Sequence, residues 1–427
     1  MVKIQVFFLV IILSTEICPS IIPLERYAQS SVIVDKTLFF FGGSLLLSPI
    51  NQILSLDVSK PFNTLDPPFE ILNVTTPVRS SFATTFFSPL KNVIYLFGGI
   101  MRNGSNTKID DDRSNLYSFN LETYKWSIPQ TNETAPGRRI QMNGVINNKT
   151  GKFYVFGGFS GKNNTALGDM NIFDTISSTW LKGSTKGSPP SLIGYTATLL
   201  SNRTIVFIGG KELYLNKLRD INQLALYDTE VDQWTSMIAR GITLENRYSH
   251  SAVLTPDERI IIFGGNTNDL TIPVLNQLAV LDTKVNPYEW SVPTPAPPSS
   301  LTISLHSATL VGNYMFVNFG KTYMKDKCQN PLPYFYILDI RNFAWVTQYE
   351  PEQLEQPGQL ERPKQPKPPG QHPQTPNNSK QIGIIIGVCL GLGLGVGIVA
   401  GLLCYKYYKK QRVNRYARQA EQCVSYN

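Results

Sequence analysis

The chain has 427 residues, of which 42% are hydrophobic and 16% are charged, a composition typical of a folded protein with a large buried core. Its formal net charge is +8, but residues 382–427 carry six basic side chains and one acidic one, or +5 of that total. The positive excess therefore belongs to one end of the chain, and it gives no reason to expect nucleic-acid binding.

Residues 1–20 predict a secretory signal peptide. Lys3 precedes the apolar run Ile4–Leu13, and small or polar residues follow up to Ser20. The apolar run is too short to span a bilayer, so we expect cleavage after Ser20.

A short apolar run that ends in two glycines recurs about every 55 residues. The copies are Leu38–Gly43, Ile94–Gly99, Phe153–Gly158, Ile205–Gly210 and Ile260–Gly265, with a degenerate sixth copy at Met315–Gly320. A fixed period of this size is typical of stacked or radially arranged copies of one supersecondary unit. The Ile, Val, Phe and Tyr runs bounded by glycine predict strands that are buried on both faces.

A further strand, which ends in Asp or Asn, follows each diglycine. The strand ends are Asp57, Asn120, Asp174, Asp228, Asp282 and Asp339, and the tryptophans that follow are Trp126, Trp180, Trp234, Trp290 and Trp345. The first copy has Phe62 where a tryptophan is expected. We expect the Asp and Asn side chains to hold Asx turns, and the tryptophans to fill the wedges between neighbouring units.

The combination of diglycine, acidic turn and spaced tryptophan resembles the kelch repeat, over roughly residues 26–349. The resemblance extends to galactose-oxidase-like proteins of the kind found in fungi. It implies an all-β fold, a six-bladed kelch-type β-propeller with one four-stranded blade per copy. Because the first and last copies each contain sequence for all four strands, the sequence leaves open how the ring closes.

The C-terminal part predicts three segments. Residues 351–381 are rich in proline and glutamine without apolar periodicity, which predicts a disordered stalk. Residues 382–404 are uncharged and long enough to form a transmembrane helix, and the basic residues 405–427 predict a cytoplasmic tail. Residues 21–350 would then form the ectodomain of a single-pass type I membrane protein, at the plasma membrane or cell surface.

Glycines recur at every fourth position of the predicted membrane span, as at Gly387 and Gly391. This spacing favours close helix association and a homodimer, and the alternative is that lipid simply tolerates small residues.

Seven Asn-x-Ser/Thr triplets lie on the side predicted to be lumenal, at Asn73, Asn103, Asn132, Asn148, Asn163, Asn202 and Asn377. We expect several of them to carry N-linked glycans. Of the five cysteines, only Cys328 is expected in the mature ectodomain, either as a buried thiol or in an intermolecular bridge.

The histidines argue against catalysis. The resemblance to copper-radical oxidases similar to galactose oxidase implies a site of two histidines and two tyrosines, one of them linked to a cysteine. This chain has only His250, His306 and His372, and the first two match a position where the kelch repeat commonly carries a histidine. We expect a protein that is not an enzyme and has no cofactor or metal. The alternative, a surface-tethered copper-radical oxidase, requires His250, His306, a tyrosine and Cys328 to converge.

The predicted ligand-binding site is a basic mouth of the propeller. In kelch-like propellers, residues before the first strand and just after the diglycine face one mouth; here these are Arg26, Arg79, Arg139, Arg247, Lys211 and Lys321. They would bind carboxylates, sulfates or an acidic loop. The alternative is that each arginine ties neighbouring blades together through backbone carbonyls. Asp110, Asp111 and Asp112, in a loop on the same mouth, are a candidate calcium site that lacks a second ligand cluster.

The sequence therefore predicts a non-catalytic recognition module. It would be a kelch propeller displayed outside the membrane to bind a protein or glycan ligand.

Overall fold

The computed structural model describes residues 23–45, 47–103, 113–270, 272–294, 303–322 and 335–352. The predicted signal peptide, most of the stalk, the membrane span and the tail lie outside these residues, as do Cys328, Asn377 and Asp110–Asp112. Among the described residues, no helix has the length and apolar character needed to span a membrane.

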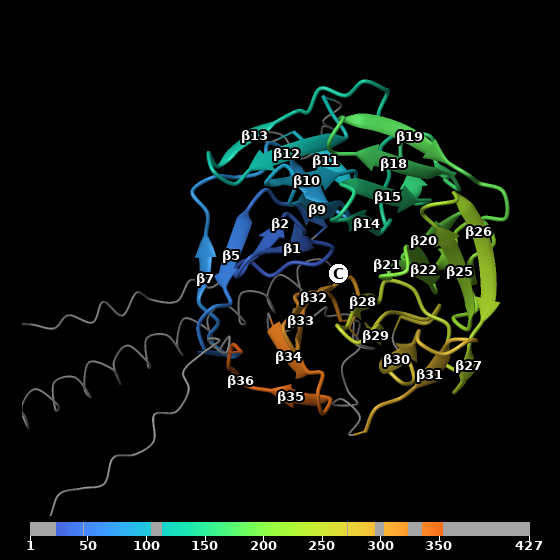
Figure 1. The fold of residues 1–427 in the computed structure, drawn as a ribbon. Coiled ribbons are helices and arrows are strands. Elements are labelled where there is room, and N and C mark those ends of the chain that lie inside the picture. The colour runs from blue at the N-terminus through green and yellow to red at the C-terminus, as the bar shows by residue number, and fades with distance from the viewer. Residues whose placement is uncertain are drawn as a thin grey trace, which may run out of the picture. The chain divides into compact units, whose positions relative to one another are not determined.

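The described residues form an all-β fold, and its six sheets of four or five mainly antiparallel strands are called blades below (Figure 1). Blade 1 contains, in spatial order, β1 (Ser30–Val34), β2 (Thr37–Phe41), β5 (Ile53–Asp57) and β7 (Phe69–Ile71). Blade 2 contains β9 (Thr84–Ser88), β10 (Val93–Phe97), β12 (Leu116–Asn120) and β13 (Lys125–Ser127), and blade 3 contains β14 (Gly144–Asn147), β15 (Lys152–Phe156), β18 (Met170–Asp174) and β19 (Thr179–Gly183). The prediction of an all-β fold is confirmed.

The other three blades repeat this order. Blade 4 contains β21 (Thr196–Leu199), β22 (Thr204–Ile208), β25 (Gln223–Asp228) and β26 (Gln233–Ile238). Blade 5 contains β28 (Ser251–Leu254), β29 (Arg259–Phe263), β30 (Leu278–Asp282) and β31 (Glu289–Ser291), and β27 (Arg240–Gly241) adds a parallel strand at its outer edge. Blade 6 contains β32 (Ser307–Val311), β33 (Tyr314–Asn318), β34 (Phe335–Asp339) and β35 (Ala344–Val346).

The first strand of each blade lies innermost. Each inner strand contacts those of the two neighbouring blades, in the cyclic order β1, β9, β14, β21, β28, β32 and back to β1 (Figure 1). The described sheets therefore surround a central axis, as the blades of a propeller do.

The ring closes through two short strands that the sequence pattern does not reveal. After blade 6, β36 (Gln348–Tyr349) pairs with β6 (Phe62–Asn63) of the first repeat. The Tyr349 hydroxyl donates a hydrogen bond to the Val58 carbonyl at 2.9 Å, and the rings of Tyr349 and Phe62 lie 5.0 Å apart. The two end blades thus keep their own four strands and are fastened to each other from outside.

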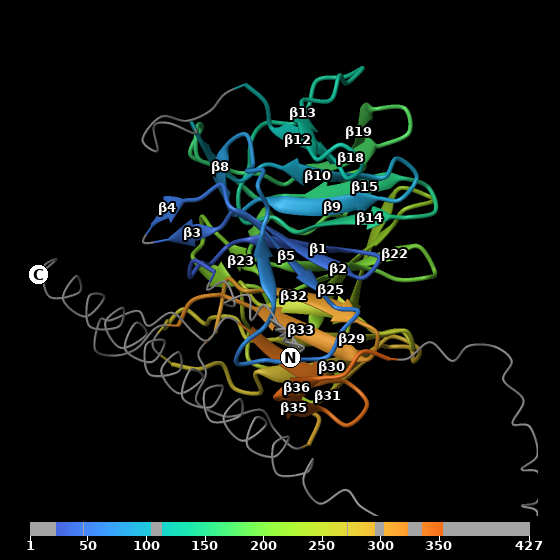
Figure 2. The ribbon, with the colours of Figure 1, turned by 90° about the vertical axis from the view of Figure 1, so that its left-hand side faces the viewer.

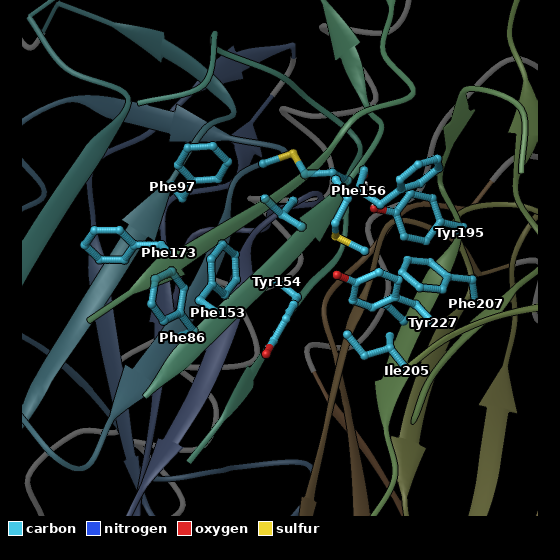
Figure 3. Close-up of a cluster of buried hydrophobic side chains, with 14 of the residues drawn as sticks. Phe86, Phe97, Phe153, Tyr154, Phe156, Phe173, Tyr195, Ile205, Phe207 and Tyr227 are labelled. Atoms are coloured by element: carbon cyan, nitrogen blue, oxygen red, sulfur yellow. Dashed lines mark hydrogen bonds between the residues drawn. The ribbon is translucent and has the colours of Figure 1, made fainter. Parts of the chain in front are cut away.

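Aromatic side chains fill the wedges between blades, as predicted. Trp126, Trp180, Trp234 and Trp345 each pack on the phenylalanine that ends the second strand of the preceding blade, at ring-centroid distances of 5.9, 5.2, 4.9 and 5.0 Å. Figure 3 shows part of the buried aromatic cluster of blades 2, 3 and 4, which includes Phe97, Phe156 and Phe207.

The position assigned to Phe62 is wrong. Phe69 pairs with Leu56 just as Trp126 pairs with Phe119, so Phe69 takes the tryptophan position of blade 1. Phe62 instead lies in the closing strand β6.

The predicted Asx turns are present in all six repeats. One side-chain oxygen of Asp57, Asn120, Asp174, Asp228, Asp282 and Asp339 accepts the N–H of the second residue beyond it, at 2.8 to 3.0 Å. The same oxygen accepts a further N–H, three residues beyond it, for Asn120, Asp174 and Asp228. The turn between the third and fourth strands is therefore held by local side-chain hydrogen bonds.

We expect Asp228→Ala to lower the free energy of unfolding by about 1 kcal/mol, because the Glu230 N–H loses its acceptor. Asp228→Asn keeps an oxygen in place, as Asn120 does in blade 2, and should cost less than half as much. Urea unfolding followed by tryptophan fluorescence measures both, and equal losses for the two variants would show that the charge matters rather than the turn.

Candidate functional site

The antiparallel order places all six diglycine positions at the same end of the ring. We call this end the diglycine face, and the end that holds the turns between first and second strands the opposite face. Figure 2 shows the ring from the side, with the short strands β3 (Ser44–Leu45), β4 (Ser48–Pro49) and β23 (Lys211–Glu212) beyond the ends of the long strands.

The second glycines form a closed set of hydrogen bonds at this face. The N–H of each donates to a carbonyl in the next blade: Gly43 to Ser80, Gly99 to Arg139, Gly158 to Leu192, Gly210 to Arg247, Gly265 to Ile303 and Gly320 to Arg26, at 2.7 to 3.1 Å. The first glycine of each pair has a positive φ and lies so close to the next blade that a Cβ at Gly264 would be 2.5 Å from the Ile303 carbonyl oxygen. The diglycine is thus the joint between blades.

A second set of hydrogen bonds surrounds the central channel. Each inner strand is preceded by a residue with φ between 54° and 62°: Ala28, Phe82, Gln141, Gly194, Ser249 and Leu305. Five of the six neighbouring pairs are joined by backbone hydrogen bonds of 2.6 to 3.1 Å, including Ala28 to Leu305 across the ring closure. The cavity inside has a volume of about 270 Å³, and its lining contains no acidic side chain, lysine or arginine.

Gln29, His250 and His306 directly follow three of the residues with positive φ, and their side chains join adjacent blades. His250 Nε2 lies 3.0 Å from Thr196 Oγ1, and His306 Nε2 lies 2.7 Å from Ser251 Oγ, in each case in the preceding blade. Gln29 takes the same position in blade 1 and donates to Ser307 Oγ at 3.2 Å. Burial lowers the pKa of both histidines to about 3, so both are neutral at physiological pH.

Both histidines thus have a structural role as links between blades. Within the part of the chain that the structure describes, no group of three or more His, Cys, Asp and Glu side chains could hold a metal ion. Cys328, which the oxidase alternative requires, lies outside that part.

Three of the six residues predicted to form a basic mouth are buried and are not exposed at the mouth of the ring. The side chains of Arg26, Arg139 and Arg247 are buried, and each donates to the carbonyl of the first glycine of its own diglycine pair, at 3.2, 3.0 and 3.4 Å. Arg139 also forms a bidentate ion pair with Asp169 at 2.8 and 3.1 Å. The acceptors of these three arginines all lie in the arginine's own repeat, so their side chains brace the loops of single blades and do not tie neighbouring blades together.

Electrostatics agree with this framework role. Burial lowers the pKa of Arg26 to about 9 and that of Arg247 to about 10, so both stay charged at neutral pH. Burial alone would raise the pKa of Asp169, but the hydrogen bonds and charge of Arg139 hold it well below its usual value.

Arg79 does not belong to the same structural column. It stands three residues before Phe82, whereas Arg26 and Arg247 stand two residues before Ala28 and Ser249, the equivalent residues with positive φ. Ser80 therefore takes the arginine position in blade 2, and Arg79 lies half-buried in β8 (Arg79–Ser81), which pairs with β11 (Ile100–Arg102). Relative to the inner strand, Arg79 thus lies one residue earlier than Arg26, Arg139 and Arg247 do.

The two predicted lysines lie on tyrosines of the following blade. Lys211 Nζ is 5.3 Å from the Tyr248 ring centroid, and Lys321 Nζ is 5.0 Å from that of Tyr27. Burial lowers the pKa of Lys321. Each pair is a cation–π contact at the diglycine face.

Five exposed apolar side chains on this face are absent from the site that the sequence predicts. Leu47, Tyr214, Leu215, Ile272 and Leu275 lie in loops that follow a diglycine, and their exposed fractions run from 54% for Ile272 to 80% for Leu47. A signal for them exists in the sequence, since residues 211–218 and 266–277 each contain several large apolar side chains after the diglycine. These side chains come from loops of blades 1, 4 and 5.

The sequons divide between the two faces. Asn148 and Asn202 are exposed in turns of the opposite face, and Asn163 is exposed in a loop of the diglycine face. Asn73 and Asn132 are exposed in the connections between blades, and Asn103 is half-buried. Asn132 Nδ2 already donates to Ser177 O and Thr179 Oγ1 of blade 3.

The comparison with known proteins agrees with the repeat geometry. A protein-family model, described as the KLHDC2/KLHL20/DRC7 Kelch-repeats domain, matches residues 83–320 and 194–363 of this chain. Together these residues are more than half of the chain. The chain belongs to the kelch-repeat family. Kelch domain-containing protein 3 of Bos taurus is 30% identical over 262 residues, which cover 56% of this chain and 64% of the bovine protein.

Other relatives show the same kelch similarity within longer proteins. Kelch domain-containing protein 3 of Homo sapiens is 27% identical over 262 residues, 56% of this chain and 64% of the relative. Human host cell factor 1 is 27% identical over 293 residues, which cover 60% of this chain and 13% of that protein. The kelch chain therefore matches less than two thirds of the length of each of these relatives.

Proposed function

We propose that this kelch chain is a non-catalytic interaction module whose six-bladed ring binds a protein partner through the loops of the diglycine face. The observation that carries the proposal is the group of exposed apolar side chains Leu47, Tyr214, Leu215, Ile272 and Leu275 on that face. Membership of the kelch family, whose domains are generally protein-interaction domains, supports it.

The loop that carries Leu275 is hydrogen-bonded to the residues before blade 5. Arg247 Nη2 donates to the Leu275 carbonyl at 2.8 Å, and the Leu275 N–H donates to Glu245 Oε2 at 2.6 Å. A partner that binds here therefore meets a surface that is largely ordered beforehand, which lowers the entropic cost of binding.

The proposal includes the location that the ends of the sequence predict. Residues 21–350 would face outward on a stalk, residues 382–404 would anchor a single-pass chain in the plasma membrane, and a homodimer would form through the glycines of that span. Outside the membrane, the ligand of the ring would be a protein or, as the alternative, a glycan. The support for location and dimer is the sequence alone.

A photo-crosslinking amino acid at position 275 of the full-length chain, produced in cells, tests the interaction proposal. We expect adducts with discrete partner proteins from this position and from position 47. Position 231 is the matched control, because Val231 is also more than half exposed but lies in a turn of the opposite face. Equal crosslinking from positions 231 and 275, or none from position 275, would contradict the proposal.

A further inference from the structure

Two hairpins on the diglycine face form one joined unit. The first connects β16 (Phe159–Ser160) to β17 (Thr165–Ala166) in blade 3, and the second connects β23 to β24 (Lys217–Leu218) in blade 4. The Ala166 N–H donates to the Tyr214 hydroxyl at 2.9 Å, which links the two hairpins. We call this unit, residues 159–166 and 211–218, the hairpin platform.

Backbone pairing attaches both hairpins of the platform to the segments that precede the inner strands of blades 3 and 4. Strand β23 also pairs with β20 (Leu192–Ile193), so the second hairpin is part of a three-stranded sheet. Ile140 and Phe159 form a β-bridge that attaches the first hairpin to the segment before β14. The platform therefore has a defined shape without a partner.

The platform combines apolar exposure with positive charge. Tyr214 and Leu215 are 67% and 70% exposed at the tip of the second hairpin. The two hairpins contain Lys162, Lys211 and Lys217 but only one acidic residue, Glu212. Lys162 and Lys217 are exposed, and neither forms an ion pair with another described residue.

The single glutamate does not cancel this charge. Glu212 acts together with Asp220 on the charge of Arg219, a buried side chain beside the hairpin. Glu212 also stands opposite Lys217 in the second hairpin, so three lysines against one glutamate leave the two hairpins a net charge of +2, which favours a partner of opposite sign.

We propose that the hairpin platform binds an acidic polypeptide segment that carries an apolar or aromatic anchor residue. The anchor packs on Tyr214 and Leu215, and the flanking carboxylates pair with Lys162 and Lys217. Tyrosine and leucine supply the desolvated centre of the contact, and the lysines at its rim raise the association rate and select for negative charge. This inference rests on the proposed interaction function and specifies the class of partner.

The test uses the purified full-length chain and fluorescein-labelled peptides of 12 residues. One peptide has four glutamates around a Leu-Trp pair, and its counterpart has glutamine in place of each glutamate. We expect the glutamate peptide to bind about tenfold more tightly at low salt, with the difference shrinking as salt rises. Fluorescence anisotropy measures both affinities.

Two paired variants, each with a matched control, locate the contact. Lys162→Glu with Lys217→Glu, and separately Tyr214→Ser with Leu215→Ser, should each weaken binding of the glutamate peptide by about tenfold. Lys91→Glu with Lys284→Glu makes the same charge change on the opposite face, and Leu90→Ser with Val231→Ser removes similar apolar exposure there. Both control pairs should stay within about twofold of the parent.

Equal binding of the two peptides would overturn the inference, and so would equal weakening by the Lys91 and Lys284 pair. Tight binding of heparin that is independent of Tyr214 and Leu215, with no binding of the glutamate peptide, would assign the platform to sulfated glycans and would also overturn it. Crosslinking from position 275 reports on the diglycine face independently. If adducts form there while the peptides fail, the acidic-segment inference falls and the interaction function stands.

Discussion

Replacing Gly264 with alanine is expected to lower the free energy of unfolding by 3 kcal/mol or more, on the order of a third of the stability of a typical domain. The glycine has a φ of 66°, and an added Cβ would lie 2.5 Å from the Ile303 carbonyl oxygen and 2.8 Å from His306 Cε1. A left-handed alanine costs about 1 kcal/mol by itself, and the contact with backbone forces blades 5 and 6 apart. The reduced entropy of the unfolded chain returns less than about 1 kcal/mol.

The matched control is Gly137→Ala. Gly137 lies in the connection before blade 3, and no atom lies within 4 Å of a Cβ built there. We expect a change within about 0.5 kcal/mol in urea unfolding followed by tryptophan fluorescence. A Gly264→Ala chain as stable as Gly137→Ala would show that the joint between blades adapts without cost.

Phe319 shows how one interface manages without this glycine. It takes the place of the first glycine in the sixth repeat and keeps a φ of 55°. Its ring packs 5.5 Å from Phe40 and 5.9 Å from Phe69, both in blade 1, and Arg26 lies 5.2 Å from its centroid. The interface that closes the ring thus uses aromatic packing where the other five use close backbone contact.

The repeated residues could be predicted from the sequence because their roles are local. An Asp or Asn that ends a strand accepts an N–H two residues later in every copy, and four of the five tryptophans pack on the phenylalanine that ends the second strand of the preceding blade. The diglycine, the Asx turns and the aromatic wedges were therefore predictable without coordinates.

The candidate site could not be predicted in the same way. Whether an arginine before the first strand faces solvent depends on carbonyls that come from loops about 15 to 30 residues away, as for Arg247 and the carbonyls of Gly264 and Leu275. The one-residue shift at Arg79 arises in an irregular connection, where no periodicity fixes the register. The pairing of β6 with β36 joins two-residue strands from opposite ends of the ring, so only the closed ring brings them together.

The side chains available to a ligand are therefore at the tips of the loops, not at the base of the inner strands. Arg26, Arg139 and Arg247 hold the diglycine carbonyls, and the hairpins carry the exposed Lys162 and Lys217. Framework and recognition are thus divided between the base of each loop and its tip, which lets the tips vary without loss of the ring.

Acidification from pH 7 to pH 5 is expected to destabilise the ring by about 4 kcal/mol, through His250 and His306. Both have a pKa of about 3 in the folded chain, against about 6.5 when unfolded. Between these values the unfolded chain binds more protons, so stability is fully present above pH 6.5 and is lost as the pH falls toward 3. At pH 5 each histidine accounts for about 2 kcal/mol, since one pKa unit equals 1.36 kcal/mol.

The cause is the burial of both rings between blades. Each Nε2 is already shared with a hydroxyl of the preceding blade, and Arg247 near His250 disfavours a second positive charge there. Asp57, Asp169, Asp257 and Asp339 have lowered pKa values, so their loss of charge affects stability mainly below pH 4 and leaves the pH 5 to 7 window to the histidines.

Blade 1 provides the variant that tests this, because Gln29 makes the same type of link without titrating. His250→Gln with His306→Gln should cost about 1 to 2 kcal/mol at pH 7 but flatten the dependence of stability on pH between 5 and 7. Urea unfolding of the full-length chain at pH 7, 6 and 5 measures both slopes. If the double variant lost as much stability on acidification as the parent, the titration would have to reside elsewhere, and the two histidines would be links between blades without any sensitivity to pH.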